Sequence, residues 1–156
     1  MQSDLLTTEQ LRLQVEKLHI QHIKLCQDNF LYFVQEVWPD FICRKEKQKS
    51  KWGHHQIIAN EFTKISDNKK GRLIINMPPR HTKSEFASVY FPAWIIGRNP
   101  KMKIMQVSHN TELAVRFGSK VRNIIDSPEY KQIFGDVKLR EDSKAKGRWE
   151  TNHGGE

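Results

Sequence analysis

Residues 72–85 read RLIINMPPRHTKSE, and this stretch decides which fold the sequence predicts. Its beginning, residues 72–76, is a short apolar run after a turn-forming DNKKG, which suits a strand buried on both faces. A helix is predicted to begin near Lys83, and Pro92 is expected to kink or split it. The segment between strand and helix is the place where nucleotide-binding folds put their phosphate loop.

The loop departs from the common phosphate-loop pattern, G-x-x-x-x-G-K-[ST], at both glycine positions. Met77 stands at the first and Thr82 at the second, while Lys83 and Ser84 match the last two. In such loops backbone amides hold phosphate oxygens, the lysine reaches the terminal phosphates and the hydroxyl binds Mg²⁺. Thr82 is unfavourable because a β-branched residue resists the positive φ that glycine adopts freely. The pattern alone leaves an ordinary strand–helix connection as the alternative.

Two further cationic side chains favour the phosphate-loop interpretation. Arg80 and His81 stand beside Lys83, which makes this part of the loop strongly positive. An arginine here can stabilise the charge that develops on a transferred phosphoryl group. Arg80 and Lys83 are therefore the candidate catalytic residues.

The rest of the chain alternates between helical and extended patterns. Residues 54–66 are a predicted helix, residues 102–108 a predicted second strand, and Asn110 is predicted to cap the helix that follows. A further strand is expected near Trp149. Strand, helix, strand and helix in this order predict an α/β fold with parallel strands and right-handed crossovers.

The N-terminal part is predicted to be helical. Thr7 and Gln10 match a capping box at the start of a helix over residues 7–25, and Asp28 is predicted to cap the next one. The first helix has an apolar face at helical spacing, made by Leu11, Val15, Leu18, His22 and Leu25.

Composition limits the classes of function that the chain can have. Its 156 residues include 26 Lys and Arg against 18 Asp and Glu, a formal net charge of +8 that favours polyanionic partners. No apolar run approaches the ~20 residues that span a bilayer, and no signal peptide is visible at the N-terminus. Two cysteines do not make a disulfide framework, so a reducing cytoplasm is expected.

Six stretches of the chain together resemble the large terminase subunit of tailed bacteriophages, the ATPase and nuclease that packages DNA into procapsids. The most specific is the PPRH-x-KSE string within residues 72–85. The six stretches are NFLYFVQEVWPDF at 29–41, HHQ at 54–56, RLIINMPPRHTKSE at 72–85, FPAWIIGRNP at 91–100, SHNTELAVRFGSKVRNIID at 108–126 and DSKAKGRWETNHGG at 142–155.

The resemblance implies a fold and a site. The fold would be an α/β, RecA-like P-loop NTPase core, with residues 1–50 as a helical lead-in and basic loop and residues 51–156 as the N-terminal part of the ATPase domain. ATP and Mg²⁺ would be the cofactors, with Lys83 on the β and γ phosphates, Ser84 on the metal ion and Gln56 at the adenine edge. The implied nucleotide-binding residues are Gln56, Pro79, Arg80, His81, Thr82, Lys83, Ser84 and Glu85.

The same resemblance implies a motor that translocates double-stranded DNA through a homo-oligomeric ring of subunits. Its partners would be the DNA, the portal protein and the small terminase subunit, in the bacterial host cytoplasm and transiently at the procapsid portal. Such an ATPase also needs a later apolar strand ending in paired acids, and no such run follows Ser84 in this chain. We therefore expect a front part of the ATPase domain that does not hydrolyse ATP efficiently alone and lacks the nuclease domain.

Other polar residues of the chain are weaker candidates. Arg116 and Arg122 are candidate fingers for a neighbour's ATP, although surface arginines are common. Ser108 and Asn110 follow the second predicted strand, where coupling groups are often found, and a plain helix cap is the alternative for them.

Three rival interpretations remain open from the sequence. Pro39-Asp40 with Asp67-Asn68-Lys69 loosely matches a nuclease metal site, and His54 and His55 with the cysteines form a poorly spaced zinc pattern. A non-catalytic basic module that binds DNA or protein is the stronger rival, because the RKEKQKSK segment at 44–51 adds five cations to the net charge.

Overall fold

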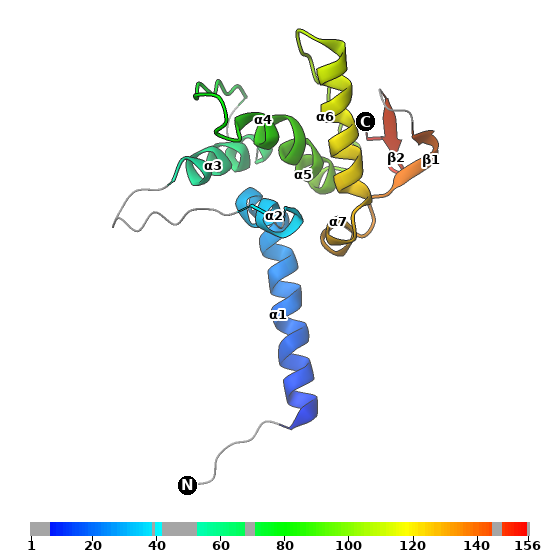
Figure 1. Cartoon of the computed structure of the whole chain (residues 1–156). Coiled ribbons are helices and arrows are strands. Elements are labelled where there is room, and N and C mark those ends of the chain that lie inside the picture. The colour runs from blue at the N-terminus through cyan, green and yellow to red at the C-terminus, as the bar shows by residue number, and fades with distance from the viewer. Residues whose placement is uncertain (1–6, 39, 42–52, 68–70, 145–147, 156) are drawn as a thin grey trace.

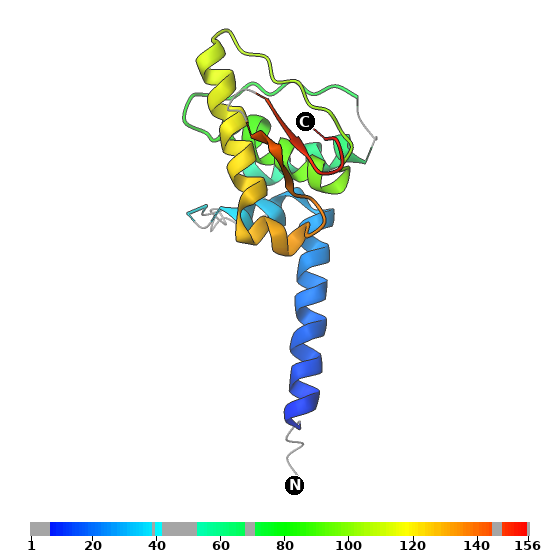
Figure 2. The same cartoon turned by 90° about the vertical axis from the view of Figure 1, so that its right-hand side faces the viewer.

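The computed structural model describes residues 7–38, 40–41, 53–67, 71–144 and 148–155. This part of the chain is mainly helical, and a long N-terminal helix projects from a body of shorter helices (Figures 1 and 2). The elements in chain order are α1 (Thr8–Asp28), α2 (Phe30–Val37), α3 (His54–Ser66), α4 (Lys83–Glu85), the π-helical η1 (Phe86–Tyr90), α5 (Phe91–Arg98), α6 (Thr111–Asp126), α7 (Pro128–Ile133), β1 (Leu139–Lys144) and β2 (Trp149–Thr151).

Helix α1 begins as predicted and then differs from the expected packing. The Thr7 hydroxyl accepts from the Gln10 N–H, and the Gln10 side chain accepts from the Thr7 N–H, so the capping box is confirmed. The apolar face is largely exposed, with Leu18 58% exposed, because most of α1 extends away from the body (Figure 1). Helical spacing shows which residues share a face, but it does not show whether another element covers that face.

The core is built around the ring of Phe30 at the start of α2. Asn29, rather than the predicted Asp28, caps this helix, and its Oδ1 accepts from the Leu31 N–H at 2.9 Å. Phe30 is fully buried, and four aromatic rings lie 5.3–5.9 Å from it. These rings come from α3, η1 and α5, so one aromatic cluster holds four elements together. Its members are Phe62, Phe86, Phe91 and Trp94.

The helix predicted from Lys83 is confirmed as a continuous run of α4, η1 and α5. The π-helical turn lies in its middle and Pro92, which has no N–H to donate within the run, follows it; Ser88 O, four residues before Pro92, accepts from Gln106 Nε2 at 2.6 Å. Five apolar residues of this run are buried: Phe86, Val89, Tyr90, Ala93 and Trp94.

Helix α6 and the C-terminal hairpin form the other side of the body. Asn110 caps α6 as predicted, because its Oδ1 accepts from the Glu112 N–H at 2.7 Å. The strand expected near Trp149 is confirmed as β2, which pairs antiparallel with β1. The Trp149 indole N–H donates to Gly118 O at 3.0 Å and so ties the hairpin to α6.

The predicted α/β, RecA-like core with a parallel sheet is wrong for this structure. The described residues contain one sheet, and it is the antiparallel pair of β1 and β2. Residues 72–76 and 102–108, the two predicted parallel strands, are extended but belong to no sheet. The parallel-sheet prediction fails because, in the part of the chain that the structure describes, no strand lies beside either segment to complete a ladder of hydrogen bonds.

The burial predicted for the first of these segments is also wrong. Leu73 and Ile75 pack against the helical core, but Ile74 is 87% exposed. This alternation is the pattern of a strand with one covered face, not of a strand buried on both. The apolar run at 72–76 therefore has helices on one side only.

One close contact in the helical body gives a stability prediction. A Cβ at Gly97 would lie 2.5 Å from Cδ2 of Phe134, a buried ring that packs against Phe33 and Tyr130. Overpacking costs about 1–3 kcal/mol, of which alanine's higher helix propensity offsets about 1 kcal/mol. We expect Gly97→Ala to lower the urea midpoint of unfolding, whereas Gly71→Ala, where nothing lies within 4 Å, leaves it unchanged. Equal midpoints for the two variants would contradict the packing at Phe134.

Candidate nucleotide-binding loop

The loop between the first extended segment and α4 has an unusual backbone. Arg80 and Thr82, with φ of 64° and 60°, are the non-glycine residues of the described chain that have positive φ. A non-glycine residue in this conformation costs of order 1–3 kcal/mol, and such strain concentrates at functional sites. Thr82 thus takes the left-handed conformation that glycine supplies in the common phosphate-loop pattern, despite its β-branched side chain.

Side-chain contacts hold Thr82 in this conformation. Its hydroxyl donates to His81 O at 2.7 Å, and its Oγ1 lies 2.8 Å from Nε2 of His55 on α3. Because the single hydroxyl proton is used on His81 O, His55 Nε2 is the donor in this pair. His81 Nδ1 in turn lies 2.9 Å from Pro79 O, so the loop is fixed from within and from α3.

The first turn of α4 lacks an internal cap. Thr82 is the N-cap residue, but its side chain makes no capping hydrogen bond because it is used elsewhere. Within the described chain, no acceptor meets the N–H groups of Lys83, Ser84 and Glu85. Unpaired N–H groups and the positive end of the helix dipole attract anions. A left-handed residue followed by helical residues also points successive backbone N–H groups in the same direction, which suits an anion.

The polar side chains of the loop and of α4 differ in exposure and in their partners. Lys83 is half-buried, and its Nζ donates to Met77 O at 2.7 Å, so the ammonium group lies across the base of the loop. Ser84 is exposed. Glu85 pairs with Lys120 of α6 at 2.6 Å, which removes much of its negative charge from the loop. Arg80 is exposed beside them, so the loop is positive overall.

Three histidines gather next to the loop. The ring of His54 lies 3.8 Å from the ring of His55 and 5.7 Å from that of His81, centroid to centroid. Burial, followed by the neighbouring His54 and His81, lowers the pKa of His55 to about 4. His55 is therefore neutral at pH 7, which agrees with its role as a single-proton donor to Thr82.

The lowered pKa of His55 predicts a pH-dependent stability. Between its ordinary value of 6.5 and about 4, the unfolded chain binds a proton at His55 that the folded chain does not. The free energy of unfolding should therefore fall as the pH falls through this window. Partial exposure reduces the effect to about 1 kcal/mol, from roughly 3 kcal/mol for the full pKa difference. Urea unfolding at pH 7 and pH 4.5 measures it.

The control for this prediction is His55→Gln, which keeps an N–H donor near Thr82 but does not titrate. Other groups contribute to the pH dependence of both proteins, so the difference between them isolates His55. The same loss of stability in both between pH 7 and pH 4.5 would contradict the lowered pKa.

Gln56, the candidate adenine-binding residue, lies on α3 next to His55. Its amide nitrogen donates to Asn60 Oδ1 at 2.9 Å, one turn further along the same helix. The N-terminal turn of α3 meets the loop through the His55–Thr82 contact, so this turn, which includes Gln56, and the loop belong to one region of the surface. The adenine contact itself stays a prediction.

The remaining sequence candidates have other environments. Asn110 is a helix cap, as in the alternative interpretation, and Arg122 Nη2 donates to Asn123 Oδ1 at 3.4 Å. Arg116 is exposed on α6. Asp67 of the nuclease pattern pairs with Arg98 at 3.0 Å. Asp40 of the same pattern is exposed, whereas its Pro39, Asn68 and Lys69 lie outside the described residues, as do Cys43 of the zinc pattern and the basic segment at 44–51.

One side-chain cluster was missed by the sequence analysis. Ligand atoms of His22, Cys26 and Glu36 lie within 4.8 Å of one another, and His22 Nε2 is 2.9 Å from Glu36 Oε2. The signal was the spacing of His22 and Cys26, which share one face of α1. Burial and then Glu36 raise the pKa of the Cys26 thiol to about 11, which disfavours the thiolate that a metal needs. We interpret the cluster as a hydrogen-bonded link between α1 and α2.

Two cavities border the second extended segment, and residues 79–85 line neither of them. The larger, of about 580 Å³, is bounded by the second extended segment, α6 and Trp149. Within the part of the chain that the structure describes, no helix is long and apolar enough to cross a membrane.

Comparison of the chain with protein-family models, with curated proteins and with solved structures gave no match. The resemblance to terminase large subunits thus rests on the sequence stretches themselves. The geometry of the loop is an independent observation, because it does not depend on any relative.

Proposed function

We propose that this chain binds ATP with Mg²⁺ through residues 79–85 and contributes this site to the large subunit of a DNA-packaging terminase. The observation that carries the proposal is the left-handed Thr82 in front of an uncapped helix that begins with Lys83. That backbone is suited to an anion, and the PPRH-x-KSE string supplies the lysine and hydroxyl that a nucleotide–metal complex uses. The proposal rests on the loop and not on a parallel sheet.

The residues of the loop have separate roles in this proposal. Lys83 would exchange its bond to Met77 O for the β and γ phosphates, and Ser84 would bind Mg²⁺. Arg80 would stabilise negative charge on the terminal phosphate, and Gln56 would bind the adenine edge by donating and accepting in one plane. The metal ion neutralises phosphate charge when it is bound.

We expect binding without efficient hydrolysis by this chain alone. Hydrolysis needs a carboxylate that activates or orients water, and Glu85, the acid within the loop, is paired with Lys120. In the proposed setting the partners are double-stranded DNA, the portal protein, the small terminase subunit and further copies in a ring. That motor works in the bacterial host cytoplasm and at the procapsid portal. The net charge of +8 supports a polyanionic partner.

Calorimetric titration of the chain with Mg·ATP, Mg·ADP and AMP tests the proposal. We expect saturable binding of the first two and much weaker binding of AMP, which lacks the β phosphate that Lys83 would contact. A parallel titration with double-stranded DNA tests the alternative, a basic module without a nucleotide site. DNA binding that weakens steeply with salt, with no heat from either nucleotide in a cooperatively folded sample, would favour that alternative.

A further inference from the structure

Residues 102–107 form an extended segment that is open along its length. Met105 and Val107 are 88% and 85% exposed, whereas Ile104 and Gln106 are half-buried against the helices. The Met102 N–H donates to Asn99 O, but within the described chain no backbone hydrogen bond joins residues 104–107 to another segment. An exposed extended segment with apolar side chains and unpaired main-chain groups is a template for a further strand.

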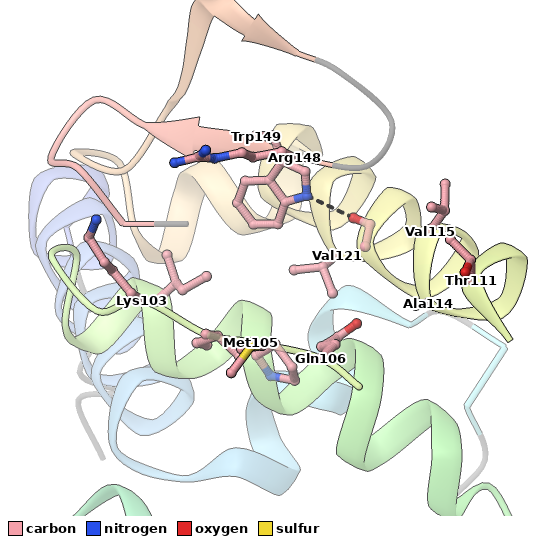
Figure 3. Close-up of a pocket in the computed structure, with 13 residues that line it drawn as sticks. Lys103, Met105, Gln106, Thr111, Ala114, Val115, Val121, Arg148 and Trp149 are labelled. Atoms are coloured by element: carbon pink, nitrogen blue, oxygen red, sulfur yellow. Dashed lines mark hydrogen bonds between the residues drawn. The ribbon is translucent and has the colours of Figure 1, made fainter. Parts of the chain in front are cut away.

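A cavity of about 580 Å³ follows one flank of this segment (Figure 3). Its walls are largely apolar and include Ile104, Val121 and the indole of Trp149, whose N–H is already used on Gly118 O. A second cavity of about 480 Å³ borders the same segment on η1 and α5. The backbone at 104–107 therefore has open space beside it that protein side chains do not fill.

The charges and polar atoms at the first cavity restrict its occupant. Lys103 and Arg148 line it, and the described residues that line it include no carboxylate, although both cations have other contacts and Arg148 lies 3.9 Å from Glu150. Gln106 lines it too, and its Oε1 is buried without a hydrogen-bond partner, while its Nε2 donates to Ser88 O. The lining is therefore positively charged, and Gln106 Oε1 is a buried acceptor that a donor from an occupant could meet.

We propose that residues 103–107 bind an extended segment of a partner protein by strand addition, with apolar side chains in the cavity and carboxylates near Lys103 and Arg148. A helix would leave the unpaired main-chain groups of 104–107 without partners, because its own are satisfied internally. A second copy would bring like charges together at this cationic face. This surface is separate from the nucleotide loop and does not depend on it.

The test uses a fluorescein-labelled seven-residue peptide of alternating valine and threonine with a glutamate at each end. Fluorescence anisotropy should show saturable binding to the folded chain. Two further peptides carry N-methyl groups on alternate residues: one is methylated at the odd-numbered residues and the other at the even-numbered residues. In strand addition only alternate N–H groups of the peptide face the neighbouring strand. One methylated peptide should therefore bind at least tenfold more weakly than the parent, and the other nearly as well as the parent. Equal binding of both methylated peptides, or no binding of the parent, would overturn the proposal.

Matched variants locate the peptide on the chain. Met105→Glu puts a negative charge on the segment and should weaken binding at least tenfold, whereas Ile74→Glu, equally exposed on the other extended segment, should change it less than twofold. Both sites are exposed, so folding is expected to be unaffected. Binding that is insensitive to Met105→Glu would place the peptide elsewhere. Sedimentation showing a dimer that Met105→Glu dissociates would identify a second copy as the occupant and overturn the proposal.

Discussion

Replacing Phe30 with alanine is expected to lower the free energy of unfolding by about 3–5 kcal/mol, which is a large fraction of the stability of a small domain. The ring is fully buried, and its four aromatic neighbours come from α3, η1 and α5. Removing it leaves a cavity among rings that cannot all move inward, and the edge-to-face contacts with Phe62 and Phe86 are lost as well. Urea unfolding followed by circular dichroism measures the change.

Tyr32→Ala is the matched control for Phe30→Ala. It removes an aromatic ring from the same helix, but Tyr32 is 45% exposed and lies outside the aromatic cluster. We expect it to change the free energy of unfolding by less than about 1 kcal/mol. Similar losses for the two variants would mean that the body is not held together around Phe30.

The helices of the structure were largely predictable because their signals are local. Capping residues and apolar spacing lie within a few residues of one another, so Thr7, Asn110 and the helix start at Lys83 could be identified from the sequence. The π-helical turn at Phe86–Tyr90 has no such signal. The exposure of α1 was also beyond the sequence, because a helical face shows an apolar pattern whether or not another element covers it.

The error in the fold class has a different physical origin. Strand formation depends on a neighbour that supplies hydrogen bonds, and that neighbour is distant in the sequence or in another chain. Residues 72–76 and 102–108 were predicted as strands; both are extended, but they belong to no sheet of the described chain. A local pattern therefore predicted the conformation of each segment and not its pairing.

In the loop, too, the residues themselves have a local sequence pattern, whereas the contacts that hold their conformation come from residues distant in the sequence. The sequence marked Thr82 as an obstacle, since threonine resists positive φ, yet the structure has it at 60°. The contact with His55 Nε2 comes from α3, 27 positions earlier in the chain, and helps to hold that conformation. The pair of Glu85 and Lys120 likewise joins residues 35 positions apart. Neither contact has a sequence signal, so the loop could be identified as a candidate site from the sequence, but the contacts that support its conformation could not.

Lys83→Ala is expected to weaken Mg·ADP and Mg·ATP binding on the order of a hundredfold, which is roughly what the loss of one or two charge-assisted hydrogen bonds produces. The ammonium group now donates to Met77 O, so its exchange onto phosphate oxygens costs one neutral hydrogen bond and gains charge-assisted ones. The uncapped amides of α4 remain in the variant and should retain weak binding. Calorimetry at fixed ionic strength gives both dissociation constants.

Lys131→Ala is the control that distinguishes a specific role of Lys83 in the loop from a general effect of the chain's net positive charge. It removes the same positive charge from α7, where Lys131 pairs with Asp126 at 2.7 Å, and should leave nucleotide binding within about twofold of the unaltered chain, since screened charges at a distance contribute little. Equal weakening by both variants would mean that nucleotides respond to the net charge of +8 and not to the loop. Unchanged binding in Lys83→Ala, with an intact unfolding transition, would exclude residues 79–85 as the phosphate site. A loss confined to Lys83→Ala would instead show that a threonine in the left-handed conformation can occupy the glycine position of a working phosphate loop.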